Sequence, residues 1–286
     1  MNSIKYFLQF IVILFLFLIF KILGFRIASD LSSFILKIFG PIFRSKKLIK
    51  ENILKAFPTI SLKDLNKIRT NMWGNYGRIL SEYVFLKDFR NSESDDNLEI
   101  IGQNILEQIK NDNKPVIFIS GHFNNFELMA MHIEKSGVNL AVIYRPLNNR
   151  FLNFIMEKIR RKYICINQIK KGVAGTRELL SFFKKNHSIA LMIDQRVSQG
   201  IKSNFFNHEA YTTTIPAQFV KKFNCKIVPI YIERINKVKF KLTINKPLEY
   251  SNEKSIEDIT LDLNRIIEKM ILENPDQWIW SHNRWK

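Results

Sequence analysis

His122 and Glu127 are the side chains whose types and spacing best suit acid–base chemistry. They lie in SGHFNNFE, residues 120–127, between a short apolar run and a helical apolar pattern. A histidine with a carboxylate partner commonly takes a proton from a hydroxyl, because the carboxylate orients the imidazole and stabilises its charged form. We predict His122 as general base and Glu127 as its partner, although a histidine near a glutamate is more often structural. The pairing requires His122 to precede the helix, since five helical positions separate side chains by ~140°.

Further candidate residues follow the ends of other apolar runs. Arg145 ends the run 140–145, and Asp194 ends the run 189–194, with Gln195 and Arg196 directly after it. If these runs are parallel strands, the side chains gather with His122 at the carboxyl edge of one sheet, where open α/β folds bind ligands. An ordinary ion pair at a strand end or a helix cap is the alternative role for Arg145 and Asp194.

Short apolar runs that alternate with helical patterns define the predicted fold. Such alternation is typical of βαβ units, so we predict an α/β fold with a mostly parallel central sheet flanked by helices. Before it, 61–88 reads as a long helix that begins at Ser61, and 91–97 as a loop. The predicted strands are 115–120, 140–145, 189–194 and 226–233, with 238–244 as an antiparallel edge.

The N-terminal segment predicts a membrane anchor. Residues 6–25 are apolar except for three positions and would extend ~30 Å as a helix, which is enough for a marginal single span or a deep anchor. A signal peptide is the rival interpretation, but no clean cleavage site follows. Basic residues cluster after the segment and favour a cytoplasmic body. We therefore divide the chain into an anchor, 1–25, and a main domain, 26–286, with a helical region 26–90 and an α/β core 98–286.

A second apolar pattern continues the anchor. Seven large apolar residues repeat at helical spacing and could lie in the membrane interface or pack on the body: Ile27, Leu31, Phe34, Ile35, Ile38, Phe39 and Ile42.

Composition excludes several other classes of protein. The ten glycines have no spacing that fits a dinucleotide fingerprint, a hydrolase nucleophile elbow or a phosphate-binding loop. The histidines lack ligand spacing, so we expect no metal and no bound cofactor. The formal charge of +18 favours acidic partners or reflects a general lysine excess. It does not predict a nucleic-acid binder, because the lysines are scattered and no nucleic-acid motif is present.

From about residue 25 onward, the chain resembles the lipid A biosynthesis (late) acyltransferases, within the glycerolipid acyltransferase superfamily. The shared features are NILKAFP at 52–58, GHFNNFE at 121–127, YRPLNN at 144–149, DQR at 194–196, FFNHEAYTTTIPAQFV at 205–220 and QWIWSHNRWK at 277–286. An N-terminal hydrophobic helix is also shared. Two departures occur: Asn124 and Asn207 stand where the family usually has glycine, and asparagine tolerates the positive φ that glycine supplies.

The resemblance implies a reaction and its partners. A fatty acyl chain of the lauroyl or myristoyl type would move from acyl carrier protein, as a thioester co-substrate, to a hydroxyl of an anionic glycolipid, the lipid A precursor. No covalent acyl-enzyme would form, with His122 as base and Glu127 as its partner. Arg145, Asp194, Gln195 and Arg196 would contact substrate. The enzyme would lie at the bacterial inner membrane with its body on the cytoplasmic face.

Two rival functions fit the same residues. A lysophospholipid or glycerol-phosphate acyltransferase would share the histidine base, and an inactive scaffold would share the fold. The glycerol-phosphate enzymes carry Glu-Gly-Thr-Arg for phosphate binding. The similar run Ala174-Gly175-Thr176-Arg177 lacks the glutamate and lies in a helical pattern, so we interpret it as coincidence.

Overall fold

A seven-stranded sheet forms the centre of the molecule. The computed structural model describes residues 2–92 and 97–286, and within them the strand order is β1-β9-β8-β2-β5-β3-β4. Neighbouring strands are parallel except for β8 and β9. The prediction of a mostly parallel sheet flanked by helices is therefore confirmed. The strands are β1 (Leu98–Ile101), β2 (Ile117–Ser120), β3 (Leu140–Tyr144), β4 (Asn167–Lys170), β5 (Ser188–Met192), β8 (Ile227–Asn236) and β9 (Lys239–Ile244).

The strands that the sequence did not predict are short or polar. β1 has the sequence LEII and β4 the sequence NQIK, and the hairpin of β6 (Ile201–Phe205) and β7 (His208–Thr212) is rich in polar residues. β9 is antiparallel to β8 as predicted, but it is not the edge strand, because β1 pairs with its other side. Part of the predicted loop 91–97, residues 93–96, lies outside the described residues.

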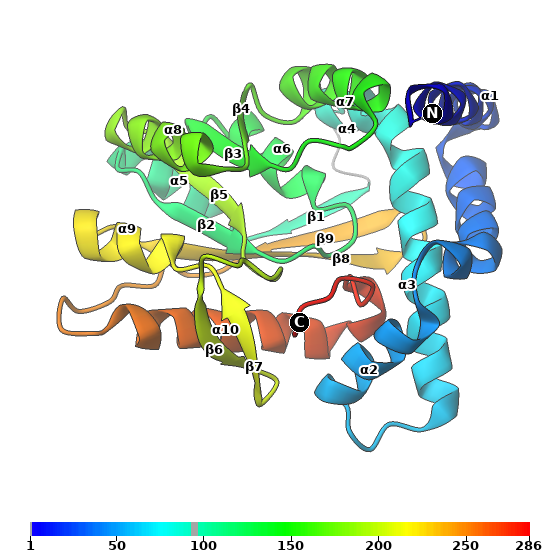
Figure 1. Ribbon diagram of the computed structural model, residues 1–286. Helices are drawn as coiled ribbons and strands as arrows, with labels where there is room; N and C mark the ends of the chain where they lie inside the picture. The colour runs from blue at the N-terminus through cyan, green and yellow to red at the C-terminus, as the bar shows by residue number, and fades with distance from the viewer. Residues whose placement is uncertain (1, 93–96) are drawn as a thin grey trace.

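Helices cover both faces of the sheet (Figure 1). The predicted helix 61–88 is divided into three elements, and Ser61 caps the first by accepting a hydrogen bond from the Asp64 amide at 3.1 Å. The N-terminal helices are α1 (Asn2–Phe43), α2 (Lys46–Ala56), α3 (Leu62–Glu82), η1 (Tyr83–Phe85) and α4 (Leu86–Asn91). The remaining ones are α5 (Gln103–Asp112), α6 (Glu127–Lys135), α7 (Arg150–Tyr163), α8 (Val173–Lys184), α9 (Ile215–Phe223), α10 (Ile256–Glu273) and η2 (Pro275–Gln277).

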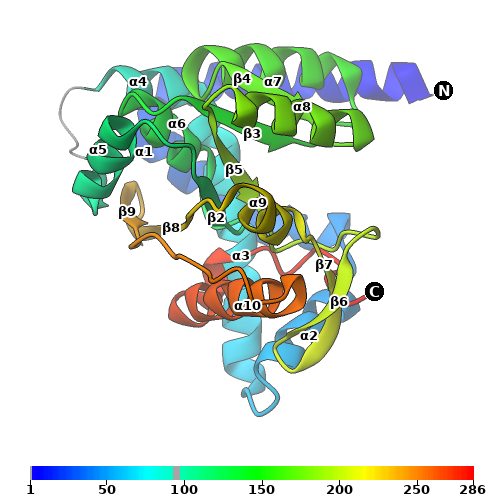
Figure 2. The same cartoon turned by 90° about the vertical axis from the view of Figure 1, so that its left-hand side faces the viewer.

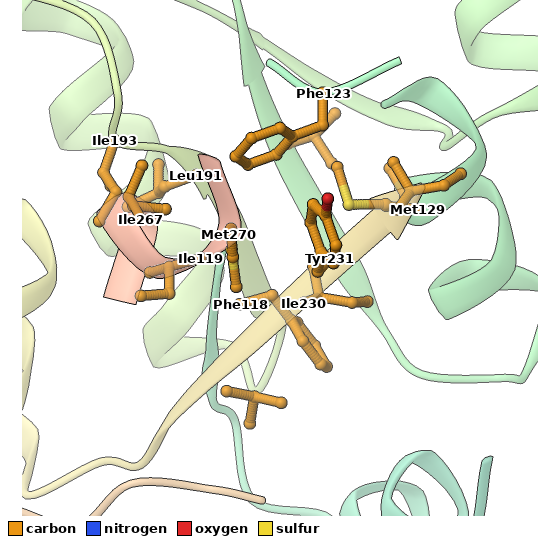
Figure 3. Packing of buried hydrophobic residues seen from close by; sticks show 14 of the residues in the cluster. Phe118, Ile119, Phe123, Met129, Leu191, Ile193, Ile230, Tyr231, Ile267 and Met270 are labelled. Carbon is orange, nitrogen blue, oxygen red and sulfur yellow. The ribbon is translucent and has the colours of Figure 1, made fainter. Parts of the chain in front are cut away.

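The hydrophobic core lies on both sides of β2 and β5. Figure 3 shows Ile119 and Leu191 beside Ile267 and Met270 of α10. Phe123, Met129 and Tyr231 form a second group next to β8. Both faces of β2 are covered, and all four of its residues are buried. Strands buried on both faces are expected as continuous apolar runs, which is why this part of the fold could be predicted from the sequence.

Helix α1 lies against α3 on one side of the body. Its backbone leaves helical geometry at Gly24, where φ is 75°, so the helix has two halves that differ in direction. In the second half, the Ser32 hydroxyl donates to the Gly77 carbonyl of α3 at 2.6 Å. A Cβ on Gly77 would lie 2.1 Å from the Ser32 carbonyl oxygen, so only glycine permits this approach.

Candidate active site

His122 lies directly after β2 and is held by the carboxylate of Asp194, which follows β5. Its Nδ1 is 2.8 Å from Asp194 Oδ1, and its backbone amide donates to Asp194 Oδ2 at 2.9 Å. β2 and β5 are adjacent parallel strands, so their carboxyl ends bring the two residues together at one edge of the sheet. The side chain of His122 remains 23% exposed, whereas that of Asp194 is fully buried.

Asp194 is kept ionised by its neighbours. Burial by itself would raise its pKa, but the His122 ring and backbone amide and the Trp278 indole outweigh burial and lower the pKa to about 2. The indole Nε1 of Trp278 donates to Asp194 Oδ2 at 2.8 Å. An ionised Asp194 must accept a proton from Nδ1 of the ring. The neutral ring therefore carries its proton on Nδ1 and leaves the Nε2 lone pair free.

Glu127 belongs to a different network from the one that the sequence predicted. It begins α6, and its Oε1 accepts hydrogen bonds from Nε of Arg160, at 2.8 Å, and from the Tyr83 hydroxyl. The Glu127 side chain is 8% exposed and that of Arg160 is 12% exposed. Burial raises the pKa of Tyr83, and Glu127 raises it further. The carboxylate on His122 Nδ1 is thus Asp194, because the adjacent strand end reaches the ring while Glu127 faces α7 and η1.

Two asparagines occupy the backbone positions at which the family usually has glycine. Asn124 has a φ of 41° and Asn207 a φ of 59°. Phe206 and Asn207 both have positive φ in the two-residue turn between β6 and β7, as a type I′ hairpin requires. Both asparagines therefore adopt the left-handed conformation that glycine would also permit. The side chain of Asn124 also donates to Gln277, which ties the motif to the C-terminal segment.

His122 lines a cavity of about 1350 Å³. One compartment is apolar and lies between α6 and the sheet. Phe118, Ala190 and Val142 stand side by side on β2, β5 and β3. Together with residues of α6 they line this compartment; the α6 residues are Met129, Ala130 and Ile133. The cavity exceeds the usual size of a site for small ligands and suits a long apolar chain.

The rim of the cavity is basic. Arg44, Arg145, Lys171 and Arg177 line it, and in residues 2–92 and 97–286 none of them forms an ion pair with a carboxylate. Unpaired guanidinium and ammonium groups are suited to phosphate. Arg177 lies in α8, so the helical interpretation of Ala174–Arg177 is confirmed, yet Thr176 and Arg177 reach the cavity.

The other predicted substrate residues take different positions. Arg145 and Gln195 line the cavity, and Gln195 Nε2 lies 3.5 Å from His122 Nε2. Asp194 lies behind His122 instead of facing substrate. The guanidinium of Arg196 is also turned away, since its Nε donates to the Lys286 carbonyl at 3.0 Å and its Nη1 to Ser198 at 3.1 Å. Neither Asp194 nor Arg196 lines the cavity in residues 2–92 and 97–286, so the structure does not bring either side chain to the cavity wall.

The C-terminal segment completes the site. Trp278 and Trp280 are buried in the core. His282 lines the cavity and accepts a hydrogen bond from the Arg196 amide at 3.1 Å. Burial lowers the pKa of His282 to about 4, so it is neutral at physiological pH. The motif at 277–286 can be recognised in the sequence, but the contact between Trp278 and Asp194 cannot, because it depends on tertiary packing.

A mostly parallel α/β sheet, a histidine at a strand end and a large, partly apolar cavity lined by basic residues suit an acyltransferase that acts on lipids. The comparison with known sequences agrees. The chain belongs to the bacterial lipid A biosynthesis acyltransferase family, whose sequence model matches residues 1–286. This membership supports acyl transfer in lipid A biosynthesis and a membrane association.

Individual relatives are distant in sequence but cover most of the chain. The lipid A biosynthesis palmitoleoyltransferase of Escherichia coli (strain K12) is 22% identical over 248 residues, 85% of this chain and 79% of the relative. The lipid A biosynthesis lauroyltransferase of the same organism is 22% identical over 249 residues, with the same coverage. A lipid A biosynthesis acyltransferase of Shigella flexneri is also 22% identical over 248 residues.

Proposed function

We infer that this enzyme transfers a fatty acyl chain from acyl carrier protein to a hydroxyl of a lipid A precursor, with His122 as general base and without a covalent acyl-enzyme. The observation that carries the proposal is the contact of His122 Nδ1 with the ionised Asp194 at the wall of a large, partly apolar cavity. It leaves Nε2 available to a substrate hydroxyl.

The reaction is a direct displacement. The acceptor oxygen attacks the thioester carbonyl carbon while His122 Nε2 takes the hydroxyl proton, and Asp194 stabilises the resulting imidazolium. The carbon–sulfur bond then breaks, and the departing thiolate receives the proton from His122. The new ester and the free carrier thiol account for all atoms, so no cofactor or metal enters the scheme.

Glu127 supports the reaction through Arg160. The carboxylate neutralises a guanidinium that lines the cavity and is largely buried. Removing the carboxylate would leave a buried charge without its partner, which is strongly destabilising in general. Glu127 therefore remains a residue needed for activity. Its proposed role is to position Arg160, whereas the sequence predicted it as the partner of His122.

The acyl chain occupies the compartment between α6 and the sheet. Ala190 stands between Phe118 and Val142 on its wall, so Ala190→Leu should shorten this space. The added leucine carbons would fill space that the end of a long acyl chain occupies. We therefore expect the variant to prefer acyl donors shorter by about two to four carbons, since each methylene excluded from an apolar site weakens binding by about 0.8 kcal/mol. Competition between donors of different length, read by mass spectrometry of the product, measures this.

Ala174→Leu is the matched control for this experiment, because Ala174 is exposed and does not line the cavity in the part of the chain that the structure describes. It should keep the wild-type preference. An unchanged preference in Ala190→Leu would place the acyl chain elsewhere.

The acceptor's phosphates contact the basic rim. Arg145, Lys171 and Arg177 supply charge at the mouth of the cavity, and phosphate pairs with arginine in a bidentate geometry. This assignment gives an anionic glycolipid an advantage over a neutral lipid acceptor. It also gives Arg145 the substrate contact that the sequence predicted.

The net charge of +18 favours an acidic carrier protein as donor. Attraction between exposed charges is screened over ~8–10 Å at ordinary ionic strength. The Michaelis constant for the carrier-linked donor should therefore rise severalfold with salt, while kcat at saturation stays nearly constant. Steady-state kinetics with carrier-linked donors and with short thioester donors that lack the carrier test this. If the Michaelis constant for the carrier-linked donor did not change with salt, electrostatic docking of the carrier would be wrong.

Acceptor competition tests the proposed function itself. The full-length purified protein would receive an acyl carrier thioester together with a lipid A precursor, a lysophospholipid and glycerol phosphate. We expect acylation of the lipid A precursor. Preferential acylation of either of the other acceptors would assign the chain to the rival activity. The same assay on membranes of known orientation tests the proposed position of the body on the cytoplasmic face of the inner membrane.

A further inference from the structure

Helix α1 has two faces over its whole length. In the first half, one stripe of apolar side chains is exposed at helical spacing, with fractions from 47% to 76%: Ile4, Leu8, Ile11, Phe15, Leu18 and Ile22. The opposite stripe is half-buried, and of its residues Phe20 is buried: Tyr6, Phe10, Ile13, Phe17 and Phe20. Burial along this half is partial, with 6% of the most apolar 18-residue window of α1 buried, and contact with the body is fixed by the residues at its two ends.

Both ends of this first half contact the body. Near its start, Asn149 Nδ2 donates to the Tyr6 carbonyl at 2.8 Å, and the Phe151 ring lies 5.7 Å from that of Phe7. Near its end, Phe20 packs with Phe85. Tyr6 and Phe20 are fourteen positions apart, or ~21 Å along a helix.

These contacts are incompatible with a simple span. A spanning helix carries its far end across a hydrocarbon core ~30 Å thick, away from a body that lies in water. Here the far end rests on the loop before α7 and on α7 itself. That helix is strongly amphipathic, and five of its residues are basic, so it cannot lie deep in hydrocarbon.

The second half of α1 continues the exposed apolar surface after the kink at Gly24. Of the stripe that the sequence could not place, Ile35 is half-buried and the other six residues are exposed, with fractions from 37% to 77%: Ile27, Leu31, Phe34, Ile38, Phe39 and Ile42. Its other face packs on α3 through Ala28, Ser32 and Ser33. Figure 1 shows both halves along the same edge of the molecule, and Figure 2 shows the first half extending beside α7.

We propose that α1 lies in the plane of one membrane leaflet, with both halves embedded by their exposed stripes, and does not cross the bilayer. Arg26, Lys46 and Lys47 flank this surface and suit an anionic leaflet. α1 ends next to the active site, since Arg44, the residue that follows its last residue, lines the cavity. A lipid acceptor can therefore enter the cavity from the leaflet that holds the enzyme.

Cysteine labelling from each side of the membrane tests this topology. Ser3→Cys would report the start of α1, and Ser251→Cys, in an exposed loop before α10, would report the body. Both would be made in a chain with Cys165→Ala and Cys225→Ser, and acyl transfer in membranes would show that the variants fold. We expect an impermeant maleimide to label both positions in vesicles of one orientation and neither in the other. Labelling of the two positions from opposite sides would overturn the proposal.

Lipid quenching gives a second, independent readout. A fluorophore on Phe34→Cys in the same background should be quenched by lipids that carry a spin label, because Phe34 is 62% exposed in the second half of α1. A fluorophore on Leu272→Cys is the control, since Leu272 is 51% exposed on α10 and outside the proposed surface. Equal quenching at the two positions, or none at Phe34, would contradict an embedded second half.

Discussion

The His122→Ala variant should lose at least about 10²–10⁴-fold in kcat, the usual contribution of general-base catalysis. The loss follows from removing the only atom that the scheme uses to accept the hydroxyl proton. The Michaelis constant for the donor should change little, because the acyl chain binds in the apolar compartment. Steady-state kinetics with a lipid A precursor as acceptor separate the two parameters.

His208→Ala is the matched control for this result, since His208 is exposed in β7, away from the cavity lining. It should retain the wild-type rate. A fully active His122→Ala, or an acyl group trapped on any serine or cysteine, would overturn the mechanism and leave the fold and the family unchanged.

Asp194→Asn should reduce kcat by about 10²–10⁴-fold, because the amide cannot stabilise imidazolium and can donate to Nδ1, which favours the wrong tautomer. Trp278 and the His122 amide would still meet a side chain of the same shape. The low pKa of Asp194, about 2, keeps the carboxylate charged throughout the working range. The asparagine amide does not ionise, so raising the pH should not restore the variant, and a pH–rate profile would show this.

Glu127→Gln is the informative comparison with Asp194→Asn. It removes the charge that pairs with Arg160 and leaves the contact between His122 and Asp194 in place. We expect an impaired enzyme with a raised Michaelis constant and a lowered melting temperature, and Glu127→Asp should retain more activity than Glu127→Gln. If Asp194→Asn were active and Glu127→Gln lost only kcat, Glu127 would be the partner of the base.

The parts of the fold that carry continuous apolar runs could be predicted from the sequence. β2, β3, β5 and β8 are buried strands, and His122, Arg145 and Asp194 follow three of them. Parallel strands bring the residues that follow them to one edge of the sheet, so the position of the site could be predicted from the apolar runs alone. β1, β4 and the β6–β7 hairpin were missed because they are short, contain polar residues or lie at a sheet edge, where tertiary pairing decides the structure.

The partner of His122 could not be predicted from spacing along the chain. Glu127 is five residues away and Asp194 seventy-two, but β5 lies next to β2 and brings the distant carboxylate to the ring. The same limit applies to Tyr83, Arg160 and Trp278, which come from three separate segments. Residue spacing identifies pairs within one turn or helix, whereas strand order determines which ends of strands meet.

Mass spectrometry of lipid A tests the central claim most directly. Cells that lack the gene would be complemented with the wild-type chain or with His122→Ala at equal protein levels. We predict that the deletion removes a single acyl chain, that the wild type restores it and that His122→Ala does not. Lipid A of unchanged mass in the deletion strain, or restoration by His122→Ala, would contradict the account.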